Sequence, residues 1–146
     1  IGDIEIHAFT KNHDASEPCS FRIEIENKSI GVLTDLGSYS RPVIEHLKQC
    51  DILFLESNYD EKMLWEGSYP WPLKKRIASD VGHLSNIQAL NLITEHAGER
   101  LHTIFLSHLS GENNTPEIAF DAFSPLHQSY NIVKTSRHAA SELLVF

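Results

Sequence analysis

The chain has 146 residues, of which 41% are hydrophobic and 22% are charged, as in ordinary globular domains. Twelve basic against 20 acidic residues give a formal net charge of −8, which excludes a surface coated for nonspecific nucleic-acid binding but leaves room for a local basic groove. No apolar run reaches the ~20 residues of a membrane-spanning helix and no signal peptide opens the chain, so we expect no membrane partner, and the two cysteines favour a cytoplasmic location.

Short strands dominate the first part of the chain. Apolar and polar residues alternate at each of them, as in half-buried strands. The three strands are expected at Ile4–Ala8, Phe21–Ile25 and Ile30–Leu33. A tight turn at Asn27-Lys28 predicts that the second and third form a hairpin.

Helices and strands alternate after residue 40. Helices are expected over Arg41–Leu47, near Asp60–Trp65, at the basic turn Lys74–Arg76, from the Ser85 cap to Glu95, and over Pro116–Phe123. Strands are expected over Asp51–Leu55, Thr103–Leu106, Tyr130–Thr135 and Glu142–Phe146. Strands followed by strand–helix alternation indicate a layered α/β domain.

Polar residues follow several of the apolar strands at the point where each strand ends. Asp35, Glu56 and His108 each come within a residue or two of such an end. In a layered sheet, residues at strand ends on one edge surround a common crevice. We therefore expect these three side chains to converge.

Nine histidines are many for a chain of this length. Four segments combine histidine or carboxylate with a strand end or a helix start, and they contain His13, Asp35, His83 and His108. Imidazole nitrogens and carboxylate oxygens are ligands of zinc and manganese, and one aspartate can bridge two ions ~3.5–4 Å apart. Each histidine can equally be a satisfied surface or core residue, so the residue types alone leave both interpretations open.

Five sequence blocks occur in an order that resembles a known family. They are His13-Asp14-Ala15 with Pro18, Thr34-Asp35-Leu36-Gly37, Leu55-Glu56-Ser57-Asn58, Gly82-His83-Leu84-Ser85-Asn86, and Leu106-Ser107-His108-Leu109-Ser110 with Asn113-Asn114-Thr115-Pro116. The chain resembles the C-terminal half of metallo-β-lactamase-fold hydrolases of the YycJ/WalJ type, which are related to ribonuclease Z and to the phosphodiesterase PhnP. The resemblance covers essentially the whole chain.

The resemblance implies a fold and a metal site. The fold would be half of a four-layer αββα sandwich that binds two divalent ions, zinc or manganese, between its sheets. His13 and His108 would each be a metal ligand, and Asp35 would bridge the two ions. Glu56 would orient His83, which would protonate the leaving oxygen or stabilise the transition state.

The resemblance also implies an activity. The expected enzyme is a dinuclear metal-dependent hydrolase of phosphodiester bonds, with metal-bound hydroxide as the nucleophile and a nucleic acid or a small phosphodiester as the substrate. A 5′-to-3′ DNA exonuclease is the leading form. Two alternatives remain: a metal-dependent hydrolase of thioesters or lactams, and a non-catalytic binding module completed by a partner chain.

One departure from the family concerns the ligand set. The signature His-x-His-x-Asp-His is absent, and no two histidines of the chain stand two residues apart. We therefore expect residues 1–146 to form a single partial domain that lacks its N-terminal half and is inactive alone.

Basic and aromatic residues give two further expectations. Lys74, Lys75 and Arg76 form the densest basic cluster, which is either a solvated helix face or a set of phosphate contacts, and Arg137 has the same two interpretations. An aromatic group of Trp65, Tyr69 and Trp71 is expected to pack over the core, with a stacking platform for a nucleobase as the alternative.

Overall fold

The computed structural model describes residues 2–141, 143 and 145. Within them lies one six-stranded sheet, in the order β1-β2-β3-β4-β5-β6. The strands are β1 Ile4–Thr10, β2 Cys19–Ile25, β3 Lys28–Leu33, β4 Ile52–Glu56, β5 Thr103–Ser107 and β6 Asn131–Lys134. The helices are α1 Arg41–Leu47, α2 Glu61–Glu66, α3 Trp71–Ile77, α4 Asn86–His96 and α5 Pro116–Ala122, followed by a 3-10 turn, η1 Ser124–Leu126.

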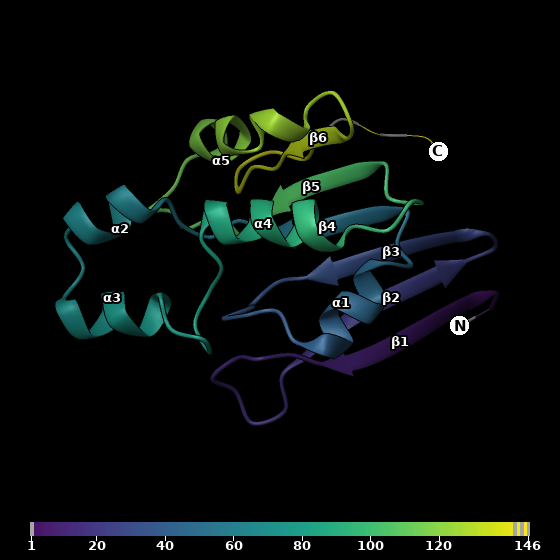
Figure 1. The fold of residues 1–146 in the computed structure, drawn as a ribbon, viewed down its shortest axis with the longest axis horizontal. Coiled ribbons are helices and arrows are strands. Elements are labelled where there is room, and N and C mark those ends of the chain that lie inside the picture. The colour runs from purple at the N-terminus through teal and green to yellow at the C-terminus, as the bar shows by residue number, and fades with distance from the viewer. Residues whose placement is uncertain (1, 142, 144, 146) are drawn as a thin grey trace.

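The strand directions place most strand ends that carry polar residues at one edge. β1, β2 and β3 pair antiparallel, whereas β3, β4, β5 and β6 pair parallel. β1 therefore runs in the direction of β3, and the carboxyl ends of β1, β3, β4, β5 and β6 meet at one edge, called the carboxyl edge below (Figure 1). The predicted α/β class and the hairpin of β2 and β3 are confirmed.

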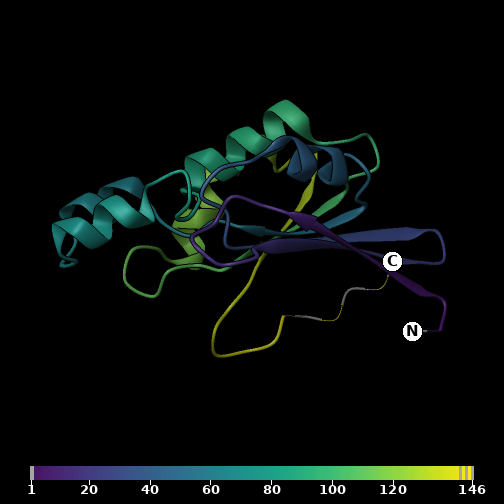
Figure 2. The same cartoon turned by 90° about the horizontal axis from the view of Figure 1, so that it is seen from below.

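One face of the sheet is covered by helices and holds the core. Leu33, Leu55 and Leu106 lie side by side across β3, β4 and β5, and each is at most 1% exposed. Val43 of α1 and Leu92 of α4 are fully buried in the same cluster. Figure 2 shows α1 and α4 on this side of the sheet. Full burial of such a side chain stabilises the fold by about 1.5–3 kcal/mol.

The opposite face, called the open face, is also apolar. Its rows are Ile6-Ile23-Ile30-Ile52 and Ala8-Phe21-Val32-Phe54-Phe105-Val133. Ile6 is 55% exposed and Phe21 is 40% exposed, while the rings of Phe54 and Phe105 stack with centroids 4.5 Å apart. Among the described residues, no helix covers this face, and residues 135–141 after β6 run past it (Figure 2).

β2 shows how the two faces differ in composition. Its polar residue Arg22 points to the helix side and is 6% exposed, whereas Phe21, Ile23 and Ile25 point to the open face. The alternation of this strand was read correctly as a half-buried strand. In β2, the helices nevertheless bury the polar side of the strand, and no helix covers its apolar side.

α2 and α3 extend past the carboxyl edge, away from the sheet (Figure 1). Asp60 caps α2 by accepting a hydrogen bond from the Met63 amide. Trp65 is 41% exposed and Trp71 is 59% exposed, with their ring centroids 5.3 Å apart. The prediction that these aromatic residues pack over the core is therefore wrong for both tryptophans, because their helices project away from it.

Helix and strand boundaries follow the predictions closely. Ser85 caps α4 in a capping box with Gln88, as the sequence indicated. The strand predicted over Glu142–Phe146 falls largely on Glu142, Leu144 and Phe146, which lie outside the described residues; Leu143 and Val145 between them are not in a strand. No helix of the described part of the chain is long and apolar enough to cross a membrane.

Candidate active site

Four loops and the last residue of β4 bring together five of the predicted site residues at the carboxyl edge. His13 follows β1, Asp35 follows β3, Glu56 ends β4 and His108 follows β5. His83 comes two residues before the Ser85 cap of α4. Segments up to 95 residues apart in sequence thus meet in one cluster. The pattern of strand ends predicted this for Asp35, Glu56 and His108, and the family resemblance implied it for His13 and His83.

Glu56 lies beneath the cluster and is fully buried. Its Oε1 is 2.6 Å from His83 Nδ1 and 2.8 Å from His108 Nδ1, and its Oε2 accepts a hydrogen bond of 2.6 Å from the Leu36 amide. An ionised carboxylate only accepts, so the Nδ1 atoms of both rings carry the hydrogens. The Nε2 atoms of His83 and His108 are then left as the available ring nitrogens.

Asp35 lies across from this carboxylate, between two imidazoles. Its Oδ1 is 3.4 Å from His108 Nε2 and 3.7 Å from His13 Nε2. Ligand atoms of Asp35, His83 and His108 all lie within 4.8 Å of one another. Two ligands of one tetrahedral zinc ion lie about 3.4 Å apart, because each is about 2.0–2.2 Å from the metal. The donor set and its spacing therefore fit divalent metal ions.

His13 is oriented by the backbone rather than by a carboxylate. Its Nδ1 lies 3.0 Å from the carbonyl oxygen of Gly82 and donates to it, so that Nε2 faces Asp35. Metal-binding histidines are commonly fixed in this way by a hydrogen bond on the other ring nitrogen. The same loop, between α3 and α4, thus positions His13 and supplies His83.

Two site residues have left-handed backbone conformations. Asp35 and His108 both have φ of 55°, where only a few per cent of non-glycine residues lie, with aspartate and histidine enriched. The Asn58 side-chain amide donates to the His108 carbonyl oxygen at 2.8 Å. Lys11 Nζ donates to the Thr34 carbonyl oxygen at 2.7 Å and lies 3.9 Å from Asp35 Oδ2. Both contacts hold the turns that present the site residues.

Close backbone approach explains the glycine at position 37. A Cβ there would lie 2.4 Å from the backbone carbon and oxygen of Asp80 and from the Gly82 nitrogen. The loop after β3 and the loop before α4 therefore touch through backbone atoms. Any larger side chain would separate the loops that carry Asp35 and His83.

The neighbours of His108 shift the pKa of its ring. Its hydrogen bond to Glu56 raises the pKa of His108, burial opposes that shift, and the charges of Glu56 and Asp35 add to it. A metal ion can bind only the neutral ring, so protons compete with the metal for His108 as the pH falls.

The three residues of the basic cluster, Lys74, Lys75 and Arg76, do not all lie at the site. Lys74 is 7% exposed, and its Nζ donates to the carbonyl oxygens of Trp65 and Gly67. The expected substrate contact is therefore wrong for Lys74, because its ammonium group links α3 to the end of α2. Lys75 lies over the exposed Trp71, with Nζ 5.5 Å from the ring centroid.

Arg76 is the member of the cluster that reaches the site. Its Nε donates to Asp14 Oδ2 at 2.5 Å, and this bond lowers the pKa of Asp14. Arg76 and Asp14 line a cavity of about 250 Å³ together with His83 and Tyr69. Its guanidinium charge is thus already paired with a carboxylate.

Sequence reasoning missed two positioning residues and one role. Asn58 was noticed as part of a motif, but its contact with His108 spans 50 residues, and nothing singled out Lys11. Glu56 was expected to orient His83, and the structure gives it His108 as a second partner.

A second group of possible ligand atoms, Glu5, His7 and Glu24, lies on β1 and β2, where Glu24 is paired with Arg22.

Comparison with known proteins adds the following. The profile of the beta-lactamase superfamily domain matches residues 1–106. Exodeoxyribonuclease WalJ of Streptococcus pneumoniae serotype 2 is 42% identical over 119 residues, which are 82% of this chain and 44% of that protein. Exodeoxyribonuclease YycJ of Bacillus anthracis is 38% identical over 119 residues, or 82% of this chain and 45% of that protein.

A solved structure shares the fold. The metallo-beta-lactamase fold protein YhfI from Bacillus subtilis superposes with a TM-score of 0.65 and 17% sequence identity, covering 92% of this chain and 48% of that chain. The present chain therefore spans about half the length of the proteins it matches.

Proposed function

The chain belongs to the beta-lactamase superfamily, and from that premise we propose that it is part of a metal-dependent hydrolase that cleaves phosphodiester bonds in DNA. The observation that carries the proposal is the position of Asp35 Oδ1 between the Nε2 atoms of His13 and His108, with Glu56 bonded to His108 from behind. Two relatives are named exodeoxyribonucleases. Their names support the phosphodiester as the bond that is cleaved and DNA as the substrate. Cleavage in the 5′-to-3′ direction is part of the same proposal.

His13, Asp35 and His108 are the residues that would hold two divalent ions, zinc or manganese, with Asp35 shared between them. Bound there, the ions would supply Lewis acidity toward the phosphate and a water molecule of lowered pKa. Nitrogen and oxygen donors of this kind suit both metals. The further ligands that a dinuclear site needs would come from polypeptide outside residues 1–146.

Glu56 and His83 would handle the proton of the leaving group. The buried Glu56 carboxylate accepts the His83 Nδ1 hydrogen at 2.6 Å, which fixes the orientation of the ring. The Nε2 atom, on the site side of the ring, would then donate to the departing oxygen. His83 can also serve as a ligand, because one of its ring nitrogens lies within 4.8 Å of ligand atoms of Asp35 and His108.

The open face supports the proposal that these residues are half of a domain. Ile6 at 55% and Phe21 at 40% exposure belong to rows of apolar side chains on this face, and exposed apolar patches mark interaction surfaces. We propose that a second sheet, carrying the His-x-His-x-Asp-His signature, packs on this face and completes an αββα sandwich. Residues 1–146 alone would then be inactive. A cytoplasmic location stays a prediction from cysteine usage.

The test uses the full-length protein loaded with zinc or manganese. Single-stranded DNA carrying a label at one end, bis(p-nitrophenyl) phosphate, a thioester and a lactam are assayed side by side. The expected result is stepwise release of nucleotides from the 5′ end, with Asp35→Ala reducing kcat/KM by about 10³-fold or more and Asp121→Ala, an exposed aspartate of α5, leaving it unchanged. Hydrolysis of the thioester or lactam without cleavage of either phosphodiester would contradict the proposal.

His83 is tested by separating metal content from rate. If it acts on the leaving group, His83→Ala keeps the wild-type metal stoichiometry and slows cleavage by about 10²–10⁴-fold. Slowing should then be largest for poor leaving groups, such as a deoxyribose hydroxyl, and smallest for p-nitrophenolate. Loss of one equivalent of metal would instead assign His83 as a ligand.

A further inference from the structure

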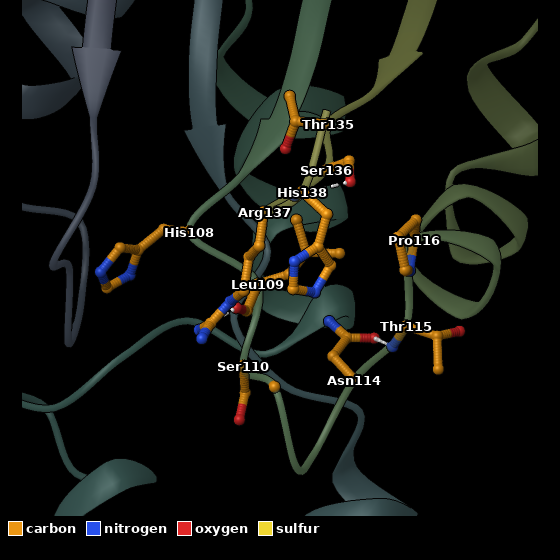
Figure 3. Close-up of a pocket in the computed structure, with 11 residues that line it drawn as sticks. His108, Leu109, Ser110, Asn114, Thr115, Pro116, Thr135, Ser136, Arg137 and His138 are labelled. Carbon is orange, nitrogen blue, oxygen red and sulfur yellow. Dashed lines mark hydrogen bonds between the residues drawn. The ribbon is translucent and has the colours of Figure 1, made fainter. Parts of the chain in front are cut away.

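A second feature of the carboxyl edge is a cavity of about 430 Å³ on the β6 side of His108 (Figure 3). We propose that this cavity is the subsite for the nucleotide next to the scissile bond, and that Arg137 binds the phosphate of that nucleotide. The inference rests on the proposed function, since it presumes a phosphodiester substrate.

The cavity lies between two segments that are distant in sequence. His108 and Ser110 come from the loop after β5, and Pro116 begins α5, whereas Arg137 and His138 follow β6. Figure 3 shows the Arg137 and His138 side chains extending into the space between these segments, with His108 at one side and Pro116 at the other. A substrate strand that reaches the candidate metal centre can therefore continue into this cavity past His108.

Charge distinguishes this cavity from its neighbour across His83. Among the residues that the structure describes, no acidic side chain lines the larger cavity, where Arg137 and two histidines lie. In the cavity of about 250 Å³ the arginine, Arg76, is already paired with Asp14. An anionic group is therefore attracted to the larger cavity and meets a neutralised pair in the smaller one.

Arg137 is held in place without losing its capacity to bind phosphate. Its Nη2 donates to the Leu109 carbonyl oxygen at 2.8 Å, and a Cβ at Gly111 would lie 3.4 Å from its Nη1. Thr135 Oγ1 donates to the Leu106 carbonyl oxygen at 2.7 Å and ties the same segment to β5. A guanidinium has five N–H donors, so one bond to a carbonyl leaves donors for a phosphate.

The size and lining of the cavity suit a nucleotide of any base. Its volume lies within the ~300–1,000 Å³ of small-molecule sites. Leu109 and Pro116 supply apolar walls for a sugar or base, beside the polar side chains of Asn114 and Thr115. An arginine that contacts a phosphate positions a strand without reading its sequence, as cleavage of DNA of any sequence requires.

The test compares Arg137→Ala and Arg137→Lys with wild type in the full-length, metal-loaded protein. The matched control is Lys48→Ala, which removes an exposed cation after α1. Each variant is assayed on a single-stranded DNA oligonucleotide and on bis(p-nitrophenyl) phosphate, which has a scissile bond but no neighbouring nucleotide. Arg137→Ala is expected to raise KM for the oligonucleotide about 10-fold or more, with its kcat and the activity on the small substrate unchanged.

Salt dependence provides a second readout of the same contact. Loss of one phosphate contact is expected to reduce the slope of log affinity against log salt by about 0.7 for single-stranded DNA. Arg137→Lys should recover this slope, because it keeps the charge, while recovering KM only in part.

The outcomes separate this inference from the proposed function. If wild type cleaves DNA and Arg137→Ala has an unchanged KM, or slows both substrates equally, the subsite is overturned and the function stands. If wild type cleaves neither phosphodiester, the function falls, and fluorescence anisotropy with the same oligonucleotide decides the subsite. Equal affinity of wild type and Arg137→Ala then overturns it, and weaker binding by the variant, but not by Lys48→Ala, supports it.

Discussion

Two buried carboxylates lie at opposite ends of β4, and they are used differently. Asp51, just before the strand, accepts hydrogen bonds from Arg100 Nη2 at 2.8 Å and from the Ser29 amide at 2.7 Å. Glu56, at the last residue of the strand, accepts from the Nδ1 atoms of His83 and His108. Asp51 is 7% exposed and Glu56 is fully buried.

The partners decide what each end of the strand can do. An arginine stays protonated at every working pH and offers no lone pair. The contact between Asp51 and Arg100 therefore stabilises the structure and takes no part in chemistry. An imidazole held through Nδ1 keeps Nε2 for a proton or a metal ion. The same strand is therefore fixed at one end by a structural clamp and carries a reactive cluster at the other.

Of the changes that compare the two ends of β4, the largest effect is expected at the reactive end. In the full-length protein, Glu56→Gln keeps the shape of the side chain but removes the charge that fixes His83 and His108. We expect metal affinity and kcat/KM to fall about 10–100-fold, as for other groups that orient metal ligands. Metal titration and a phosphodiesterase assay measure both.

Asp51→Asn is the matched control for that change, since it makes the same substitution at the other end of the strand. It should leave metal affinity unchanged. Equal losses in Glu56→Gln and Asp51→Asn would mean that both act only through the stability of β4, and the comparison would fail.

The next effect is on stability at the clamped end. Asp51→Asn removes a charge-assisted pair with Arg100 and weakens the bond to the Ser29 amide. We expect the free energy of unfolding of the full-length protein to fall by about 1–3 kcal/mol at pH 7. Urea unfolding followed by circular dichroism measures it, and no change would show that solvent already screens the pair.

Lowering the pH should remove the contribution of the Asp51 carboxylate to the free energy of unfolding. Burial raises the pKa of Asp51, but the bonds from Arg100 and the Ser29 amide outweigh it and hold the pKa below its ordinary value. The folded pKa thus lies below the unfolded value of about 3.9, so the stabilisation is present above that pH and is lost as the pH falls through the folded pKa. The difference between wild type and Asp51→Asn should therefore shrink below about pH 4. A difference that stays constant down to pH 3 would contradict this origin.

The smallest effect concerns the thiol beside the clamp. Burial raises the pKa of Cys50 to about 11, whereas Cys19 is partly exposed. A thiol reagent at pH 8 is expected to modify Cys19 quickly and Cys50 slowly, because the thiolate is the nucleophile. Asp51→Asn should speed the modification of Cys50, and equal rates for both thiols in wild type would show that this end of the sheet is open.

Strand ends could be predicted from the sequence because they depend on local pattern. An apolar run followed by Asp35, Glu56 or His108 fixes an end, and parallel pairing gathers such ends at one edge. The burial of Lys74 could not be predicted from the sequence. It depends on where α3 meets the end of α2, and the neighbouring basic residues do not indicate that contact. The bond between Glu56 and His108 spans 52 residues and leaves no trace in local sequence.

The two faces of the sheet show a second limit of sequence reasoning. Alternation in β1 and β2 indicates that each strand has an apolar and a polar side, but it does not say which side the helices cover. The helices cover the side with His7 and Arg22, while Ile6 and Ile23 face away from them. An apolar face left open in this way favours packing against another apolar layer.

The most direct measurement locates the metal. Crystals of the full-length protein grown with manganese are expected to give two anomalous difference peaks that share Asp35, one about 2.0–2.3 Å from His13 Nε2 and the other about 2.0–2.3 Å from His108 Nε2. Peaks at Glu5, His7 and Glu24 instead, or no peak beside Asp35, would contradict the account.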